Sequence, residues 1–364
     1  FGQCPPNQDC VQRLDMEHES SLLYLGPIYT LHGGAPDGFL YAPNALHEDL
    51  QQELSHAAVT TYCEAPHVTN IDSVPPKPHE QVVHDQSMWS LWKQQELDPN
   101  DNKEKDRHSH DQPKYYKTFG KLSWATTGYH YDWTKRSYDE NAKSEMPPLM
   151  EKVSCLFAQT AMAVLHQQKM QEKEKSNNNG NSTSHGSNNH NQLESSKTST
   201  DTPSFSFTPS ASIVNYYNPK SLMGGHRDDL EMALDKPVVS WSLGRPAIFL
   251  LGGLRKDDTP IFPILVRPGD VMILGGASRL AFHGMARLLP ESNKLPSVNP
   301  VAVASLDQQV SLASLGIHKT DLSAEEQSAL QVYLSQHRIN MNIRQVYPDD
   351  HHTTSQNESK WRVK

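Results

Sequence analysis

The residues best suited to chemistry lie in one segment, Asn215 to Asp228, which ends in His226-Arg227-Asp228. On an extended chain, residues two apart point to the same face, so His226 and Asp228 can aim an imidazole and a carboxylate at one point. These groups are two of the three ligands of a facial metal site that leaves coordination positions open for other molecules. The segment therefore predicts part of a metal centre.

The His-x-Asp pattern is weak evidence by itself, because the chain holds 19 His and shows the pattern three times. The other two copies are His47-Glu48-Asp49 and His130-Tyr131-Asp132. A solvated loop pair is the alternative interpretation of any one copy. The third copy is distinguished by His283, which follows an apolar run between glycines that is typical of a buried strand. A lone His after a strand is more often structural, but His226, Asp228 and His283 together are the candidate catalytic metal ligands.

A second candidate stretch runs from Arg338 to Arg344 and alternates strictly between polar and apolar residues. It predicts either an edge strand with a wet face or an inward polar face that binds an anion. An arginine suits the second role because its fork meets a carboxylate with two parallel hydrogen bonds. Six residues of strand span about 20 Å. At that separation the two arginines are not expected to hold the same carboxylate group. We therefore assign Arg338 to the far carboxylate of a diacid and Arg344 to the end nearer the metal.

The His-x-Asp pair, the distant His and the Arg-x-Asn-x-x-x-Arg strand together resemble the AlkB family of Fe(II)/2-oxoglutarate dioxygenases. Asn215-x-Tyr217 resembles that family's co-substrate-binding Asn-x-Tyr, and residues 240–253 resemble its central strand pair. The resemblance covers about residues 115–347 outside one insert. It is nearest to the AlkB homologue one branch at residues 122–133 and 340–346.

The resemblance implies a double-stranded β-helix, or jelly roll, in a mainly β or α+β protein. It also implies that Fe(II) is held by His226, Asp228 and His283, with 2-oxoglutarate and O2 as co-substrates. The residues that it implies for co-substrate binding are Asn215, Tyr217, Arg338, Asn340 and Arg344. The implied reaction removes N-methyl groups from nucleobases, N6-methyladenine in DNA or 1-methyladenine in tRNA, and releases formaldehyde, succinate and CO2. Leu230 stands where bacterial relatives carry a base-contacting Asp, so the choice of base is not carried over.

Residues 115–138 crowd aromatic side chains between lysines and arginines, as stacking on bases and holding phosphates requires. The alternative is an aromatic-rich hairpin that packs on the core. The resemblance favours a nucleotide-recognition lid and implies substrate contacts from Trp124, Tyr129, His130 and Tyr131. Because a base must leave its stack to reach a buried iron, we expect methylated DNA or RNA that is single-stranded, looped or bulged.

Composition limits the other partners. The net charge of −9 argues against binding nucleic acid by bulk electrostatics, so a local patch or shaped contacts are required. No apolar run reaches the length that spans a bilayer, and we expect an intracellular monomer without a membrane partner. The four cysteines form no Cys-x-x-Cys and predict no disulfide framework.

Short β-rich runs punctuated by glycine and proline from 207 onward predict a sandwich or barrel. Their predicted strands are 213–217, 237–243, 247–251, 261–266, 270–274, 279–283 and 338–346. The predicted helices are 47–58, 84–98, 147–169 and 323–336, the last opened by a capping box from Ser323 to Glu326. The predicted organisation is a flexible tail (1–23), a helical and loop extension (24–114), the lid (115–140), a supporting helix (141–171), a disordered Asn/Ser-rich insert (172–206), the jelly-roll core (207–348) and a tail (349–364).

Two other functions compete with a nucleobase demethylase. One is an Fe(II)/2-oxoglutarate hydroxylase or demethylase that acts on protein, which the aromatic and basic stretch at 115–138 disfavours. The other is an inactive jelly-roll module that only binds nucleic acid, which the intact set of His226, Asp228 and His283 disfavours. Succinate formation that depends on iron and 2-oxoglutarate separates an enzyme from a module.

Overall fold

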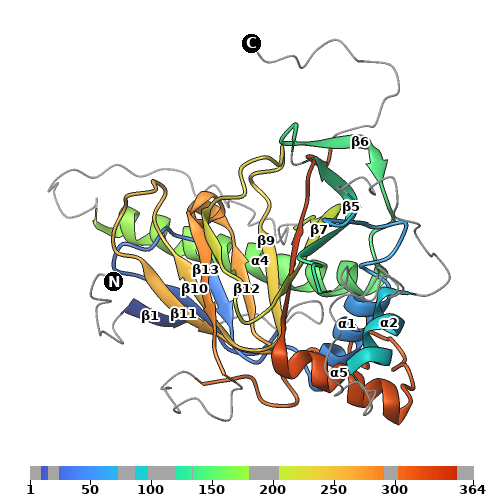
Figure 1. Ribbon diagram of the computed structural model, residues 1–364. Helices are drawn as coiled ribbons and strands as arrows, with labels where there is room; N and C mark the ends of the chain where they lie inside the picture. The colour runs from blue at the N-terminus through green and yellow to red at the C-terminus, as the bar shows by residue number, and fades with distance from the viewer. Residues whose placement is uncertain are drawn as a thin grey trace, which may run out of the picture.

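The computed structural model describes residues 10–14, 24–72, 87–96, 120–132, 134–179, 205–290 and 302–350. Two sheets carry this part of the chain (Figure 1). The larger has the strand order β1-β2-β3-β12-β9-β14-β7-β5-β4, with β6 paired to β5, and the smaller has the order β11-β10-β13-β8. The pairings between these strands are antiparallel.

The strands are β1 (Val11–Leu14), β2 (Ile28–Leu31), β3 (Phe39–Ala42), β4 (Val68–Thr69), β5 (Trp124–Asp132), β6 (Ser137–Lys143), β7 (Ala211–Tyr217), β8 (Met223–His226), β9 (Val238–Gly244), β10 (Ala247–Leu251), β11 (Phe262–Val266), β12 (Val271–Leu274), β13 (His283–Leu288) and β14 (Arg338–Arg344). The helices are α1 (Glu48–Thr60), α2 (Met88–Glu96), α4 (Pro148–Asn179), α5 (Ala324–Gln336) and the short 3-10 helix η2 (Gly276–Leu280). Among the described residues, no helix is both long and apolar enough to cross a membrane.

Two apolar clusters hold the layers together. The first covers one face of the larger sheet, where Trp241 and Ile339 pack with Phe157 of α4 and other residues of α1 and α5. The second joins the two sheets through side chains such as Met272 of β12 and Phe249 of β10. Each fully buried side chain of this size contributes roughly 1.5–3 kcal/mol relative to an exposed one. The larger sheet is therefore covered by helices on one face and, in part, by the smaller sheet on the other.

Strand β14 lies in the middle of the larger sheet, between β9 and β7. Its apolar residues belong to the helix-facing cluster, so its polar residues face the smaller sheet. The edge-strand interpretation of residues 338–344 is therefore wrong, because both sides of the strand are hydrogen-bonded to neighbours. Arg338 is fully buried, and Arg344 is 4% exposed.

Helices α1 and α5 begin within a residue of their predicted positions, each at a polar cap. His47 accepts a hydrogen bond from the Asp49 amide, and Ser323 Oγ accepts one from the Glu326 amide at 3.1 Å. The predicted capping box is incomplete, because the Glu326 carboxylate turns instead to the indole of Trp89 on α2. Trp89 stacks on the neighbouring tryptophan of α2 at 4.8 Å between ring centroids, so these side chains pack the helix as predicted.

Helix α4 is longer than the sequence predicts. It continues to Asn179, past the predicted start of the insert at residue 172. The glutamines, glutamates and lysines that precede Asn179 are good helix formers, which explains the extension. Residues 180–204 of the predicted insert lie outside the described residues. The predicted tail at 1–23 also contains a strand, since Val11–Leu14 pairs with Ile28–Leu31.

The strand predicted for residues 279–283 is wrong. Gly276–Leu280 instead forms η2, and β13 begins only at His283. Gly276 has a φ of +52°, a conformation that favours glycine, and Ser278 Oγ donates to the Gly275 carbonyl at 2.9 Å. These two features close the chain into a turn. Of the residues in this turn, Ser278 and Arg279 are buried, and Leu280 is half-buried.

Candidate metal centre

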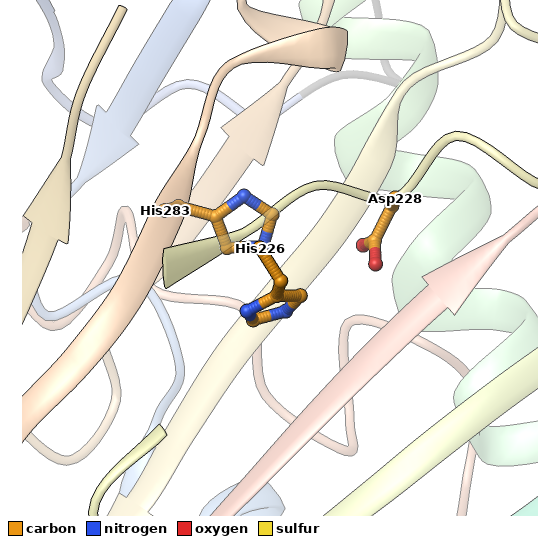
Figure 2. Close-up of side chains that lie close together, drawn as sticks. All are labelled: His226, Asp228 and His283. Atoms are coloured by element: carbon orange, nitrogen blue, oxygen red, sulfur yellow. The ribbon is translucent and has the colours of Figure 1, made fainter. Parts of the chain in front are cut away.

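Antiparallel pairing of β8 with β13 brings His226 opposite His283. The centroids of the two imidazole rings are 4.4 Å apart, and Asp228 follows β8 by two residues. One ligand atom from each of His226, Asp228 and His283 lies within 4.8 Å of the other two. Figure 2 shows the Asp228 carboxylate facing the two rings. This is the one such group of three or more His, Cys, Asp or Glu side chains among the described residues.

Hydrogen bonds orient both imidazoles toward a shared centre. His226 Nδ1 bonds to the Gly224 carbonyl at 3.0 Å, and His283 Nδ1 bonds to the Ala281 carbonyl at 3.0 Å. A carbonyl accepts, so each Nδ1 carries the proton and each Nε2 keeps its lone pair. Metal-binding histidines usually donate their second nitrogen in this way, which fixes the tautomer and the ring.

The protonation states also suit a cation. Burial raises the pKa of the Asp228 carboxyl. The opposing effect of Arg344, His283 and His226 is larger and lowers the pKa to about 2. The Arg344 Nη2 atom lies 3.1 Å from Asp228 Oδ2. Burial lowers the pKa of the His283 imidazole, so the neutral ring is favoured. An ionised carboxylate and neutral imidazoles are the forms that bind a metal ion.

Arg338 is the clearest sign of an anion-binding site. It is fully buried, and its Nη2 donates to Ser242 Oγ at 2.9 Å. Its Nε and Nη1 have no hydrogen-bond partner among the described residues. Burial lowers the pKa of the Arg338 guanidinium to about 10. A buried guanidinium with two open donors costs free energy unless a carboxylate completes it, so the site fits a ligand with a carboxylate group.

The strand register places three more predicted co-substrate residues beside Arg338. Tyr217 on β7 is paired with Arg338 of β14, and Asn215 is paired with Asn340. Residues i and i+2 share a face, so all four point into the space between the sheets. Asn340, however, already donates to Ser240 Oγ and to the Trp241 carbonyl, each at 2.9 Å. Those bonds leave Asn340 a role in the sheet as well as at the site.

Arg344 lies beside Asp228 at the other end of β14, and its role in co-substrate binding stays a prediction. Its Nη1 donates to Glu231 at 3.1 Å and its Nη2 faces Asp228 at the same distance. The Nε atom has no partner in the part of the chain that the structure describes. Arg344 is thus held by two carboxylates, and Nε is the donor that remains for a ligand.

The predicted lid forms a hairpin of β5 and β6 that extends the larger sheet (Figure 1). Trp124 is half-buried and paired with Asn215 of β7. Lys143 Nζ lies 5.2 Å from the centroid of the Tyr129 ring. The ring centroids of Tyr131 and Tyr138 are 5.3 Å apart. Residues 115–119 and Trp133 lie outside the described residues.

The other two His-x-Asp copies do not gather ligands. His47 caps α1, as its position suggested. His130 Nδ1 lies 2.9 Å from Thr126 Oγ1, and Asp132 accepts from the amides of Thr134 and Lys135 in a turn. The predicted contact between His130 and the substrate therefore stays a prediction, since the ring already bonds to Thr126.

Sequence reasoning missed three residues that surround Asp228. Glu231 and Arg279 are almost fully buried and form an ion pair at 2.8 Å. Tyr138 donates to Glu231 at 2.8 Å. The available signal was charge in an apolar setting, because Glu231 follows Leu230 and precedes Met232, but it did not identify the partners.

Comparison with known proteins places the chain. It matches the family model described as the 2OG-Fe(II) oxygenase superfamily over residues 84–344. It is 28% identical over 319 residues to "DNA N(6)-methyladenine demethylase ALKBH1A" of Arabidopsis thaliana, covering 85% of this chain and 75% of the relative. It is 27% identical over 315 residues to "Nucleic acid dioxygenase ALKBH1" of Homo sapiens, covering 86% of this chain and 65% of the human protein. The solved structure of OsALKBH1 covers 87% of this chain and 100% of that chain at 19% identity and a TM-score of 0.39.

The chain therefore belongs to the 2OG-Fe(II) oxygenase superfamily, and within it to the AlkB family. It is an Fe(II)/2-oxoglutarate-dependent dioxygenase that uses Fe(II), 2-oxoglutarate and O2. The predicted jelly-roll core is confirmed by the family and by the two antiparallel sheets.

Proposed function

We propose that this enzyme removes N-methyl groups from nucleobases in DNA or RNA. The observation that carries the proposal is the joint occurrence of a three-ligand centre and a buried arginine with open donors beside it. The names of the relatives point to the substrate: one is a "DNA N(6)-methyladenine demethylase" and another, of Schizosaccharomyces pombe, a "tRNA demethylase". The aromatic and basic hairpin supplies side chains suited to stacked bases.

In this proposal His226, Asp228 and His283 hold the iron. Arg338 receives the distal carboxylate of 2-oxoglutarate through Nε and Nη1, and Tyr217 and Asn215 line the same face. The bound iron would couple the decarboxylation of 2-oxoglutarate to the oxidation of a methyl group by O2. The balanced outcome is one N–H, one formaldehyde, one succinate and one CO2 per methyl group and O2 consumed.

The chain itself binds, orients and excludes water. The burial of Arg338 and Ser242 keeps the distal carboxylate in a low-dielectric setting, where its ion pair is stronger than in water. The carbonyls of Gly224 and Ala281 hold the two imidazoles in the metal-binding tautomer. Placement of this kind is what a protein contributes when a cofactor carries the difficult chemistry.

The hairpin would present a base to this centre. Trp124 lies on the register position next to Asn215, so one of the predicted stacking residues adjoins the co-substrate face. A base must leave its stack to reach a buried centre, which favours single-stranded, looped or bulged nucleic acid. The net charge of −9 disfavours tight binding to long duplexes by bulk charge, so local contacts carry recognition. We expect the enzyme to act as an intracellular monomer.

The decisive experiment is a mass-spectrometric screen of methylated nucleic acids. The iron-loaded protein is incubated with 2-oxoglutarate and with N6-methyladenine DNA or 1-methyladenine tRNA oligonucleotides, each as single strand, bulge and duplex. We expect loss of methyl groups with stoichiometric formaldehyde and succinate, greatest on unpaired bases. The His226→Ala variant is the control and should release neither product.

A protein substrate is the competing outcome of the same screen. A set of N-methylated peptides is assayed beside the oligonucleotides. If the peptides lose methyl groups or gain oxygen while every oligonucleotide stays intact, the nucleobase proposal is wrong.

A further inference from the structure

Glu231 is the hub of a buried hydrogen-bond network next to the metal centre. It lies three residues after Asp228 and is 4% exposed. Its Oε2 accepts from Arg279 Nη2 at 2.8 Å. Its Oε1 accepts both from Arg344 Nη1 at 3.1 Å and from the Tyr138 hydroxyl at 2.8 Å. A charge buried this completely requires such partners, and here three separate elements supply them.

Arg344 and Arg279 each bind both Glu231 and Asp228. Arg344 holds the carboxylate of Asp228 through Nη2 at 3.1 Å. Arg279 Nη1 donates to the backbone carbonyl of Asp228, and its Nε donates to the Lys236 carbonyl at 3.1 Å. Glu231 therefore restrains the side chain of Asp228 by one path and its backbone by another. Asp228 lies on an irregular segment between β8 and β9, so no sheet ladder fixes it.

Tyr138 ties the hairpin to this hub. It is the half-buried residue of β6, and the other six residues of that strand are exposed. Among the described strands, β6 pairs only with β5, so the Tyr138 hydroxyl bond to Glu231 is a direct link from the hairpin to the metal-centre network.

The charges within the network balance. Two buried guanidinium groups, Arg279 and Arg344, face two carboxylates, Glu231 and Asp228. Removing one member of a buried network leaves an unpaired charge, and the remaining groups must move to find solvent or another partner. The arrangement of Asp228 is thus sensitive to Glu231, and the arrangement of Glu231 is sensitive to Tyr138.

We propose that Glu231 is a positioning residue for the metal ligand Asp228 and that Tyr138 couples the β5–β6 hairpin to the metal centre. The inference rests on the proposed function for the roles of Asp228 and the hairpin. Coupling between two sites is reciprocal in binding free energy. Loading of the metal site should therefore order β6, just as a substrate held by the hairpin should favour the metal-binding arrangement of Asp228.

The first test measures metal affinity in Glu231→Gln by titration with Mn(II) in the absence of any nucleic acid. An amide cannot accept from both arginines and the tyrosine, so we expect affinity to fall about 10–100-fold, as for other residues that orient metal ligands. The matched control is Glu326→Gln, which removes a partly buried carboxylate from Trp89 and should leave metal affinity unchanged. Wild-type affinity in a folded Glu231→Gln variant overturns the positioning role.

The second test uses Tyr138→Phe, which removes one hydroxyl and keeps the ring. Amide hydrogen exchange of residues 137–143 is followed with and without Mn(II) plus 2-oxoglutarate. We expect loading to slow exchange several-fold in the wild type and to have no effect in Tyr138→Phe. Tyr216→Phe is the control, because it loses a buried hydroxyl bond to the Ala58 carbonyl on the opposite face of the sheet.

Equal protection of β6 in wild type and Tyr138→Phe, or none in either, overturns the coupling. Neither test contains a methylated base. A failed demethylation screen would therefore leave both results interpretable, and a failed coupling test would leave the demethylase proposal standing.

Discussion

The polar face of β14 and the β5–β6 hairpin use similar residues in opposite surroundings. On β14, Arg338 and Arg344 are almost completely buried, and three of their side-chain nitrogens have no hydrogen-bond partner among the described residues. On the hairpin, the Lys135 side chain is 72% exposed and pairs with Asp132 at 3.2 Å in a turn. An exposed pair of this kind adds little to stability because water and salt screen it, whereas losing one partner of a buried charge costs about 3–5 kcal/mol.

This difference separates the chemistry from the recognition. The centre needs fixed geometry, and the β14 residues obtain it from burial and from neighbouring strands on both sides. In the proposed function the hairpin makes adaptable contacts with a base, and among the described strands β6 pairs only with β5. Substitutions on β14 should therefore abolish or sharply weaken turnover, and substitutions on the hairpin should change which substrate is bound and how tightly.

The largest effect is expected at Asp228, the metal ligand that pairs with Arg344 of β14. Asp228→Ala removes an anionic ligand and leaves Arg344 without its carboxylate partner. We expect succinate formation to fall at least on the order of a thousandfold, about 4 kcal/mol, with loss of Mn(II) binding. Asp229→Ala is the neighbouring control, since Asp229 pairs with Arg227 instead. Retained metal binding in Asp228→Ala would contradict the view that the metal centre depends on this buried carboxylate.

The next effect tests the anion site. Arg338→Lys keeps the charge but loses the planar fork that two open donors provide. We expect the KM for 2-oxoglutarate to rise about 10–150-fold, the equivalent of about 1.5–3 kcal/mol for a charged hydrogen bond. Arg255→Lys, whose side chain is 86% exposed, should keep the wild-type KM. An unchanged KM in Arg338→Lys would show that the 2-oxoglutarate carboxylate lies elsewhere.

The hairpin is tested by Trp124→Ala. A base stacked on an aromatic ring contributes about 1–3 kcal/mol, and we expect the lower end, roughly a fivefold rise in KM for a methylated oligonucleotide, because Trp124 is half-buried. Succinate formation without nucleic acid should not change. Trp124→Phe, which keeps a stacking ring, should restore most of the affinity. Formaldehyde release that is the same in wild type and Trp124→Ala rules out the lid assignment.

The same division explains what the sequence could predict. Alternation along Arg338–Arg344 identified two faces, because side chains alternate on any strand. It did not show that β14 is central, since that depends on β7 and β9, which lie about a hundred residues earlier. Capping at Ser323 was visible because it involves residues three apart.

The partners of the metal centre illustrate the limit. His-x-Asp located His226 and Asp228 from local spacing, but the approach of His283 depends on the pairing of β8 with β13. Glu231 could not be assigned because its partners come from β6, η2 and β14. Arg279 was placed on a strand because it lies in an apolar run, and the glycine turn before it changed the outcome.

The smallest effect concerns pH and lies at the base of the hairpin. His67 Nδ1 lies 2.7 Å from Ser144 Oγ, and His130 Nδ1 lies 2.9 Å from Thr126 Oγ1. Burial lowers the pKa of both imidazoles below 6.5, and His130 lowers the pKa of His67 further. At pH values between these lowered pKa values and 6.5, the unfolded chain binds more protons than the folded chain.

The free energy of unfolding should therefore be highest above pH 6.5 and fall as the pH decreases through 6.5 toward the folded pKa values. The double variant His67→Gln with His130→Gln should lose that part of the slope, while the contribution of buried His283 remains in both proteins. Urea unfolding of the metal-free proteins at pH 5, 6 and 7 measures the difference, with His318→Gln as an exposed control. If the double variant keeps the full wild-type slope, the hairpin does not respond to pH through this pair. A reduced slope would show that neutral, half-buried imidazoles stabilise the protein at the base of the hairpin, whereas the metal centre depends on paired charges.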